Sequence, residues 1–178
     1  MLSKPNVFLI GPMGSGKSAV GRHLARLLRF SFCDSDADIE AKTGVDISFI
    51  FEKEGEAGFR QREQESIERL TGLQSVVIAT GGGAVILAAN RRVLAERGTV
   101  VYLETSVAQQ MERTRHGRHR PLLNDTDPKV KLGELMDQRV ALYTEVADLT
   151  VSTDGRRVQL VAEEIHRELQ RARAPKNV

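Results

Sequence analysis

The feature that most limits the fold of this chain is a glycine-rich stretch near its start. Residues 11–18 read Gly-Pro-Met-Gly-Ser-Gly-Lys-Ser, which fits the spacing G-x-x-x-x-G-K-[ST] of a phosphate-binding P-loop. An apolar run precedes the stretch at residues 6–10, and a helical pattern follows it at residues 19–28. This order lets backbone N–H groups converge on phosphate oxygens at the positive end of a helix. A chance match in a surface loop is the alternative, and the strand-to-helix context argues against it.

The chemistry of a P-loop assigns roles to its last residues. We expect Lys17 to reach the β- and γ-phosphates of a nucleotide as a mobile positive charge, and the Ser18 hydroxyl to contact a magnesium ion. Lys17 is therefore expected to be exposed at the rim of the sheet and absent from the core. The residues expected to bind the nucleotide here are Gly14, Ser15, Gly16, Lys17, Ser18 and Ala19.

The rest of the chain alternates short β-rich runs with longer helical patterns. Strands are expected at residues 7–10, 30–33, 76–79, 100–103 and 149–151. Helices are expected at 17–28, 36–43, 47–53, 56–70, 88–97, 107–113, 129–143 and 157–173. The alternation predicts an α/β fold with a parallel sheet between two layers of helices, and right-handed crossovers place the loops after the strands on one rim. With 178 residues, the chain is expected to form one domain, 1–178.

Composition argues against several other classes of protein. The 26 basic and 24 acidic residues give a formal net charge of +2, so no overall field favours nucleic acid or a membrane surface. The lone Cys33 excludes an intrachain disulfide, and its apolar neighbours indicate a small buried residue rather than a reactive thiol. We find no signal sequence and no apolar run near the roughly 18 residues of a membrane span. We therefore expect a cytoplasmic protein without nucleic-acid or membrane partners. We also expect a monomer, a prediction for which the composition gives no separate argument.

Two aspartates follow the second expected strand, in the run Asp34-Ser35-Asp36. At a strand-to-helix turn their carboxylates can diverge, one toward a metal ion and the other toward a substrate hydroxyl. The alternative is that the run only caps the next helix, since aspartate and serine are preferred caps. Its position near the P-loop favours the metal and substrate roles.

The third expected strand is followed by three consecutive glycines, Gly81, Gly82 and Gly83. Glycines at the rim of a sheet indicate backbone that passes close to a ligand or adopts positive φ. A flexible loop without a role is the alternative.

Residues 113–127 have the composition of a lid. Arginines alternate there with histidine and glycine, at Arg113, Arg115, Arg118 and Arg120. A mobile Arg-rich cover suits phosphoryl transfer, because closure excludes water and brings positive charge to the transferring phosphate. A solvated basic loop is the alternative.

Taken together, these pieces resemble the shikimate kinase family. The matching pieces are the P-loop, the 34–36 turn, Gly55-Glu56 with Phe59-Arg60 and Glu63, the run 81–83, Arg120-Pro121-Leu122-Leu123, and Arg139 with Leu142-Tyr143. They occur in the family's order and spacing over nearly the whole chain. The resemblance implies a P-loop kinase, a three-layer sandwich with a five-stranded parallel sheet in the order 2-3-1-4-5. It also implies substrate-binding helices at about 36–70 and a lid at about 113–127.

The resemblance assigns roles by position. Asp34 approaches magnesium through water, and Asp36 holds the shikimate hydroxyls, including the one that is phosphorylated. The substrate carboxylate is gripped by Arg60 and Arg139, above a wall formed by Gly81, Gly82 and Gly83. Arg120 reaches the transferring phosphate, Arg113 packs on adenine, and Arg156 belongs to a loop on the adenine side. The implied catalytic residues are Lys17, Asp36 and Arg120, and the implied metal ligands are Ser18 and Asp34.

The implied reaction is the transfer of the γ-phosphoryl group of ATP, with Mg²⁺, to the 3-hydroxyl of shikimate, a step of aromatic amino-acid biosynthesis. One alternative is a kinase of another small hydroxy acid such as gluconate. A nucleotide-dependent switch is a second, and the lack of an Asn-Lys-x-Asp guanine-reading motif argues against it. The sequence departs from the family's usual pattern at Ala19, often threonine, and at Ala141, usually proline. The second departure predicts an unkinked helix around Arg139.

Overall fold

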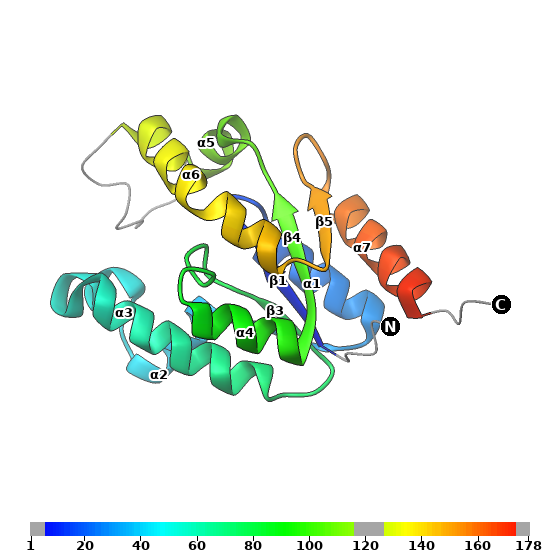
Figure 1. Ribbon diagram of the computed structural model, residues 1–178, viewed down its shortest axis with the longest axis horizontal. Coiled ribbons are helices and arrows are strands. Elements are labelled where there is room, and N and C mark those ends of the chain that lie inside the picture. Colours follow the sequence, from blue (N-terminus) through cyan, green and yellow to red (C-terminus); the bar gives the residue numbers. More distant parts are fainter. Residues whose placement is uncertain (1–5, 116–126, 174–178) are drawn as a thin grey trace.

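The backbone forms one sheet of parallel strands in the order β2-β3-β1-β4-β5 (Figure 1). The structure, a computed structural model, describes residues 6–115 and 127–173. Its strands are β1 (Asn6–Ile10), β2 (Ser31–Asp34), β3 (Val76–Ala79), β4 (Gly98–Glu104) and β5 (Leu149–Ser152). Its helices are α1 (Lys17–Leu28), α2 (Ser35–Thr43), α3 (Ile47–Thr71), α4 (Ala88–Arg97), α5 (Val107–Thr114), α6 (Pro128–Val146) and α7 (Val158–Arg173). The predicted strand order and fold class are confirmed.

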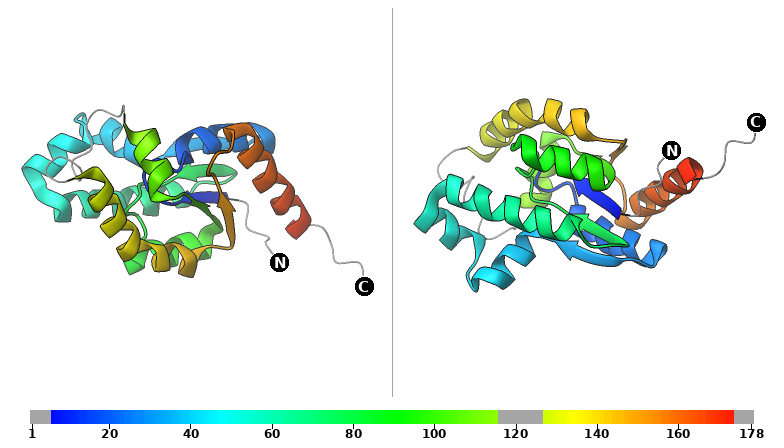
Figure 2. Two further views of the ribbon diagram at one scale, coloured as in Figure 1. Left: turned by 90° about the horizontal axis from the view of Figure 1, so that it is seen from above. Right: turned by 60° about the horizontal axis from the view of Figure 1, so that its bottom comes forward.

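Strand β1 is the centre of the sheet and is buried on both faces. It pairs with β3 on one side and β4 on the other, and all five of its residues are buried. Val7 and Leu9 belong to the cluster that packs against α1 and α7. Phe8 and Ile10 point the other way, into a cluster with residues of α3, α4 and α6. Figure 2 shows these two helix layers on opposite faces of the sheet, the three-layer arrangement expected of a parallel sheet.

A third, smaller core lies beside the carboxyl end of the sheet, between α2 and α3. It is formed by Ile39, Ile50 and Phe59. The helix α3 contains a non-helical residue, Gly55, with φ of 69°. The two predicted helices 47–53 and 56–70 are therefore the two arms of α3, and glycine permits the break because it has no Cβ to clash at positive φ.

Other details modify the sequence-based expectations. Helix α6 continues through Ala141 to Val146 without interruption, as the missing proline predicts. Cys33 is only half-buried, where we expected a buried residue. Burial raises the pKa of its thiol, in agreement with an unreactive side chain.

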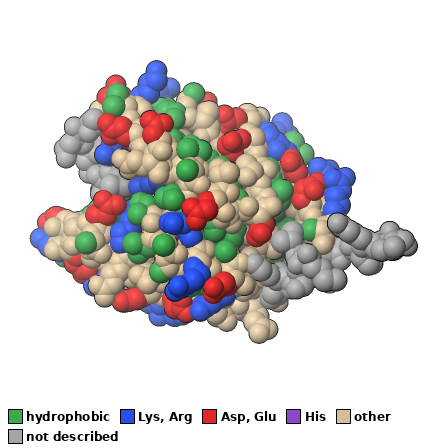
Figure 3. Space-filling view, in the orientation of Figure 1, with side chains coloured by type: hydrophobic (Ala, Val, Ile, Leu, Met, Phe, Trp, Pro, Cys, Tyr) green, Lys and Arg blue, Asp and Glu red, His purple; other side chains and the backbone are tan. Residues whose placement is uncertain are grey.

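The described surface agrees with the nearly neutral composition. Figure 3 shows basic and acidic side chains interspersed on the face seen in Figure 1. None of the helices in residues 6–115 and 127–173 is long and apolar enough to cross a membrane. The predicted lid at 113–127 lies mostly outside the described residues.

Two glycines in helices provide a test of the packing. A Cβ on Gly21 of α1 would lie 2.6 Å from Phe32 Cε2 of β2, whereas a Cβ on Gly133 of α6 would meet nothing within 4 Å. We predict that Gly21→Ala lowers the free energy of unfolding by about 1–3 kcal/mol through overpacking. Gly133→Ala is predicted to raise it by about 0.5–1 kcal/mol through helix propensity. Urea unfolding followed by circular dichroism measures both, and an equal gain for the two variants would contradict the close approach of α1 to β2.

Candidate active site

A cleft of about 780 Å³ opens at the carboxyl end of the sheet. This volume is in the range of small-molecule sites, roughly 300–1,000 Å³. Its walls come from the P-loop, α1, α2, α3, the glycine turn after β3, and α6. The predicted residues that line it are Gly14, Gly16, Lys17, Ser18, Ala19, Asp34, Asp36, Arg60, Gly81, Gly82, Gly83 and Arg139. The fold therefore brings together residues from across the sequence.

The P-loop has the tight backbone that its glycines predict. Gly14 and Gly16 have φ of 77° and 88°, the left-handed region in which a side chain is strained. Gly16 caps α1, which begins at Lys17. The positive end of α1 therefore faces the cleft, as an anion-binding site requires.

The position of Lys17 differs from our expectation. The side chain is only 9% exposed, so the prediction of an exposed residue is wrong. Its ammonium donates to the carbonyl oxygens of Gly11 and Pro12, both at 2.7 Å, and to Ser15 Oγ at 3.3 Å. The loop curls around the lysine with its carbonyls turned inward, and the three donors of an ammonium make this arrangement favourable. Ser15, predicted among the nucleotide-binding residues, is itself buried within the loop.

Asp34 serves two purposes at once. Its Oδ1 accepts hydrogen bonds from the backbone of Asp36 at 3.0 Å and Ala37 at 3.3 Å, which caps α2. Its Oδ2 accepts from the Ser18 hydroxyl at 2.5 Å. Asp34 therefore caps α2, as the alternative supposed, but capping is not its only contact, because the second oxygen is directed at the P-loop. Ser18 and Asp34 together present hard oxygen donors of the kind that Mg²⁺ prefers, so the residues present fit this ion.

Asp36 has an unusual environment for a carboxylate. Its Oδ1 is buried and has no hydrogen-bond partner among the described residues. Burial raises the pKa of Asp36 to about 7, and the nearby Glu63 and Asp34 carboxylates add to the effect while Lys17 opposes it. Buried polar atoms are normally hydrogen-bonded. The unpaired oxygen therefore indicates a place for a hydrogen-bond donor from a ligand.

Arg60 and Glu63 form a buried ion pair one turn apart on α3. Arg60 Nη1 donates to Glu63 Oε2 at 2.7 Å, and Arg60 Nη2 donates to Glu56 Oε1 at 3.1 Å. Burial by itself would lower the pKa of Arg60, but these carboxylates raise it. The pKa of Glu63 is raised by burial against the opposing effect of Arg60 and Arg139. Glu63 had no role in the sequence-based account, although its spacing of three from Arg60 places the two on one helical face.

Arg139 reaches the same space from α6 and is 5% exposed. Its Nε, like that of Arg60, is buried without a hydrogen-bond partner within the described part of the chain. A methyl group built on Gly82 would lie 3.8 Å from Arg139 Nη1, and one on Gly83 would lie 2.3 Å from Arg60 Nη2. The two guanidinium groups thus lie against consecutive residues of the glycine turn. Such a pair is suited to an anionic group such as a carboxylate.

Glycine is required at positions 81–83 because other side chains lie close to the backbone there, and not because the backbone angles are unusual. The glycines with positive φ in the described chain are at positions 11, 14, 16, 44, 55 and 155, so Gly81, Gly82 and Gly83 do not need glycine for that reason. A Cβ on Gly81 would lie 2.7 Å from Glu63 Oε1 and 2.9 Å from Asp36 Oδ1. The loop-without-a-role alternative does not agree with this packing, because a side chain there would collide with the charged groups.

The remaining predicted residues lie away from this cluster. Arg113 Nη1 donates to Gly14 O at 3.1 Å and its Nη2 to Thr153 O at 2.7 Å, so it connects the P-loop with the loop after β5. Arg156 turns back onto Ser152 O at 3.0 Å and forms an ion pair with Glu164 of α7. Neither arginine lines the main cleft. Arg120 lies outside the described residues.

Comparison with known proteins identifies close relatives. The family model described as shikimate kinase matches residues 13–170. A shikimate kinase of Halorhodospira halophila is 57% identical over 92% of this chain and 93% of its own length. A solved structure of shikimate kinase from Acinetobacter baumannii in complex with shikimate is 47% identical, with a TM-score of 0.94 over 97% of this chain and 96% of that one. A gluconokinase from Sinorhizobium meliloti is 16% identical with a TM-score of 0.57 over 95% of this chain and 93% of that one, and shares the fold alone.

The raised pKa of Asp36 predicts a stability effect with a defined sign. Since the pKa is about 7 in the folded protein and 3.8 in the reference state, the folded state binds the proton more tightly. The free energy of unfolding therefore falls as the pH rises from about 4 to about 7, and the full loss is present above pH 7. We predict that Asp36→Asn, measured without ligands, raises the free energy of unfolding at pH 8 by on the order of 1–3 kcal/mol. The gain should shrink as the pH falls and vanish near pH 4.

A matched control is Asp38→Asn on the same helix. Asp38 pairs with Arg69 and accepts from the Ser66 hydroxyl at 2.7 Å, so its replacement should give no gain at pH 8. Chemical unfolding at pH 8 and pH 4.5 makes both comparisons. A gain for Asp36→Asn of the same size at both pH values would contradict the assignment to carboxylate ionisation.

Proposed function

This chain belongs to the shikimate kinase family, and from that premise we propose how its residues divide the reaction among them. The enzyme transfers the γ-phosphoryl group of ATP to the 3-hydroxyl of shikimate, which gives shikimate 3-phosphate and ADP. The observation that supports the assignment of roles is the meeting of two buried guanidinium groups with a buried, unpaired carboxylate oxygen beside the P-loop.

On the substrate side, Arg60 and Arg139 hold the shikimate carboxylate. A guanidinium fork matches the two oxygens of a carboxylate, and the buried position strengthens the interaction because little water competes. The Arg60 fork is oriented in advance by Glu63 and Glu56. The ring of shikimate lies against the wall formed by Gly81, Gly82 and Gly83, and its hydroxyls face Asp36.

On the nucleotide side, the loop amides of Gly14, Ser15 and Gly16 and the start of α1 bind the phosphates of ATP. Lys17 moves from the loop carbonyls to the β- and γ-phosphates, a rearrangement that a flexible four-carbon side chain permits. Arg113 and Arg156 contribute to the adenine side, and Arg120 from the lid reaches the transferring phosphate. The Arg113 role is supported by its contact with Gly14 O.

Ser18 and Asp34 would hold Mg²⁺, Ser18 directly and Asp34 through water. Magnesium, when bound with ATP, neutralises charge on the β- and γ-phosphate oxygens. The pairing of the Ser18 hydroxyl with Asp34 Oδ2 keeps both oxygens at the phosphate end of the cleft.

Asp36 orients the attacking hydroxyl. The 3-hydroxyl oxygen forms a bond to the γ-phosphorus as the bond from that phosphorus to the leaving ADP oxygen breaks, and Asp36 accepts the hydroxyl proton late in the transfer. A carboxylate with a pKa of about 7 is able to hold that proton and release it to solvent afterwards. Positioning and charge neutralisation supply most of the rate enhancement. Cytoplasmic location and a monomeric state stay predictions of the sequence.

The substrate assignment is tested by ADP release in a coupled assay with shikimate, gluconate and other hydroxy acids. The pair Arg60 and Arg139 together with the glycine wall favours a compact cyclic carboxylate over an open-chain one. Turnover with gluconate at a rate equal to or above that with shikimate would overturn the assignment.

The same assay tests the carboxylate clamp. We predict that Arg60→Ala and Arg139→Ala each raise the KM for shikimate roughly 30-fold to 1,000-fold, corresponding to about 2–4 kcal/mol of lost charge-assisted binding. The KM for ATP should hardly change, and lysine at either position should restore binding only in part. Arg62→Ala is the control, because Arg62 is an exposed residue of the same helix that pairs with Glu54 at 2.7 Å. A rise in the KM for ATP alone would contradict the carboxylate clamp and assign the two arginines to nucleotide binding.

Substitutions of Asp36 and Asp34 should affect different kinetic quantities. Asp36→Asn is predicted to lower kcat by about 100-fold or more, because it removes the proton acceptor. Asp34→Asn is predicted to raise the magnesium concentration required for half-maximal activity by roughly tenfold, as expected for a residue that orients the ion through another group. Asparagine keeps one acceptor oxygen, so α2 stays capped. Magnesium titrations of both variants measure kcat and the magnesium requirement. A raised magnesium requirement in Asp36→Asn and a lowered kcat in Asp34→Asn would contradict this assignment of the two roles.

A further inference from the structure

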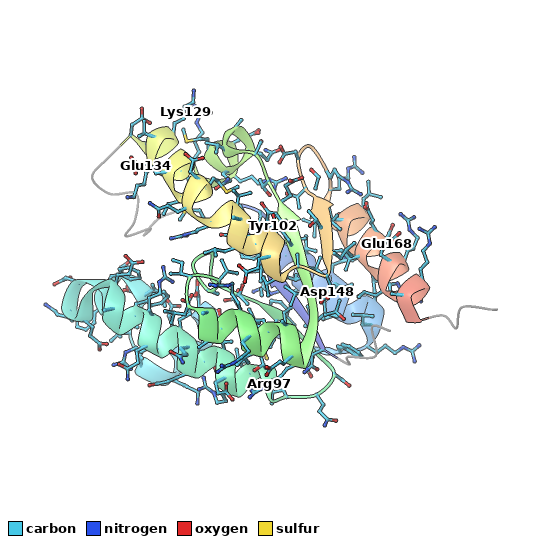
Figure 4. The ribbon with its side chains drawn as sticks, in the orientation of Figure 1. Arg97, Tyr102, Lys129, Glu134, Asp148 and Glu168 are labelled. Atoms are coloured by element: carbon cyan, nitrogen blue, oxygen red, sulfur yellow. The ribbon has the colours of Figure 1, made fainter. Side chains whose placement is uncertain are left out.

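The two tyrosines of the chain stack on each other beneath the active site. Tyr102 of β4 and Tyr143 of α6 have ring centroids 5.0 Å apart and an interplanar angle of 21°. They are 2% and 1% exposed, and Figure 4 shows Tyr102 beside α6. Both rings belong to the apolar cluster between the sheet and the second helix layer.

Their hydroxyl groups differ. The Tyr143 hydroxyl donates to the carbonyl oxygen of Gly82 at 2.6 Å. The Tyr102 hydroxyl is buried and has no hydrogen-bond partner within residues 6–115 and 127–173. The Tyr143 hydroxyl is therefore bonded to the glycine wall, whereas Tyr102 contributes a ring that stacks on Tyr143.

Gly82 lies where three parts of the active site meet. A methyl group built on it would be 3.4 Å from the backbone nitrogen of Met13 in the P-loop and 3.8 Å from Arg139 Nη1. Tyr143 follows Arg139 by one helical turn of α6, so both side chains lie on the same face of that helix. Burial raises the pKa of the Tyr143 phenol, and the Arg139 guanidinium opposes that rise, which agrees with their proximity.

The bond to Gly82 determines the direction of the next amide. The peptide between Gly82 and Gly83 is planar and trans, so the Gly83 N–H points opposite to the Gly82 carbonyl. In the described residues this N–H makes no hydrogen bond with another protein group. Gly83 is also the residue against which the Arg60 guanidinium lies. A rotation of this one peptide would thus disturb both the wall and the clamp.

We propose that Tyr143 is a positioning residue for the shikimate side of the active site, which fixes the Gly82–Gly83 peptide through its hydroxyl. The inference rests on the proposed function and extends it, because it assigns the hydroxyl a role that the ring stack alone does not require. Tyr143 touches neither reacting atoms nor phosphate. It acts through the glycine wall and through its contact with Arg139, both on the shikimate side, and so affects one substrate only.

The test is Tyr143→Phe, which keeps the ring and its stack and removes only the hydroxyl. The Gly82 carbonyl then loses its buried donor, and we expect the KM for shikimate to rise roughly 5-fold to 50-fold. The KM for ATP should stay within about twofold, since the donors of the P-loop do not depend on this hydroxyl. Calorimetric titration with shikimate should show a loss of affinity of the same size.

Tyr102→Phe is the matched control. It removes the hydroxyl without a partner from the same stacked pair, and both Michaelis constants should stay as in the wild type. Equal effects of the two substitutions would overturn the inference, as would a Tyr143→Phe variant that loses stability but binds shikimate normally. A wild-type protein that does not phosphorylate shikimate would instead defeat the proposed function.

A spectroscopic measurement keeps the inference testable if Tyr143→Phe does not fold. Because the chain contains two tyrosines, the Tyr102→Phe variant grown with 3-fluorotyrosine carries a single fluorine label, at position 143. Its fluorine NMR signal should shift on addition of shikimate and shift less on addition of ADP. A signal that does not respond to saturating shikimate would overturn the positioning role.

Discussion

The active site depends on a balance of buried charge at the carboxyl end of the sheet. Two guanidinium groups, Arg60 and Arg139, share a confined space with the carboxylates of Asp36 and Glu63. A buried charge is costly unless it is paired and hydrogen-bonded, and here the pairing is incomplete. Glu63 satisfies one edge of Arg60 at 2.7 Å, while oxygens of Asp36 and Glu63 and the Nε atoms of both arginines are left without partners in the described chain. Carboxylates accept and hydroxyls donate hydrogen bonds, so a substrate with one carboxylate and several hydroxyls has groups of the kind that these atoms lack.

The sheet holds these charges together at a small structural cost. Its central strand β1 is buried on both faces, and its parallel neighbours β3 and β4 end on the same rim. The apolar layers lie below that rim, so the polar residues that follow each strand converge above the core without interrupting it. The small core of α2 and α3 supports Asp36 and Arg60 from the side. Function and stability are thus separated in space, except at Asp36, where the folded protein accepts a destabilised carboxylate.

The glycine turn shows how backbone and side chains cooperate in the site. It is held from several directions: the Gly81 amide donates to Ser35 Oγ at 3.0 Å, the Gly82 carbonyl accepts from Tyr143, and the Ala84 carbonyl accepts from Asn90 Nδ2 at 2.9 Å. A run of glycines that lacks side chains of its own is therefore held in place by hydrogen bonds from other elements. This explains why a run of flexible residues serves as a wall.

The sequence by itself determined the fold class, the position of almost every strand and helix, and the candidate residues of the site. These signals are local or periodic: the P-loop spacing, the alternation of β-rich and helical runs, and the charged residues placed directly after strands. The tertiary structure decided what depends on contacts between distant segments. It showed that Lys17 is enclosed by its own loop, that Asp34 caps α2 and pairs with Ser18 at once, and that Glu63 orients Arg60. It also brought Tyr143 to Gly82, which lies 61 positions away in the sequence. Such contacts have no local signature, because burial and hydrogen-bond geometry arise only when the helices pack on the sheet.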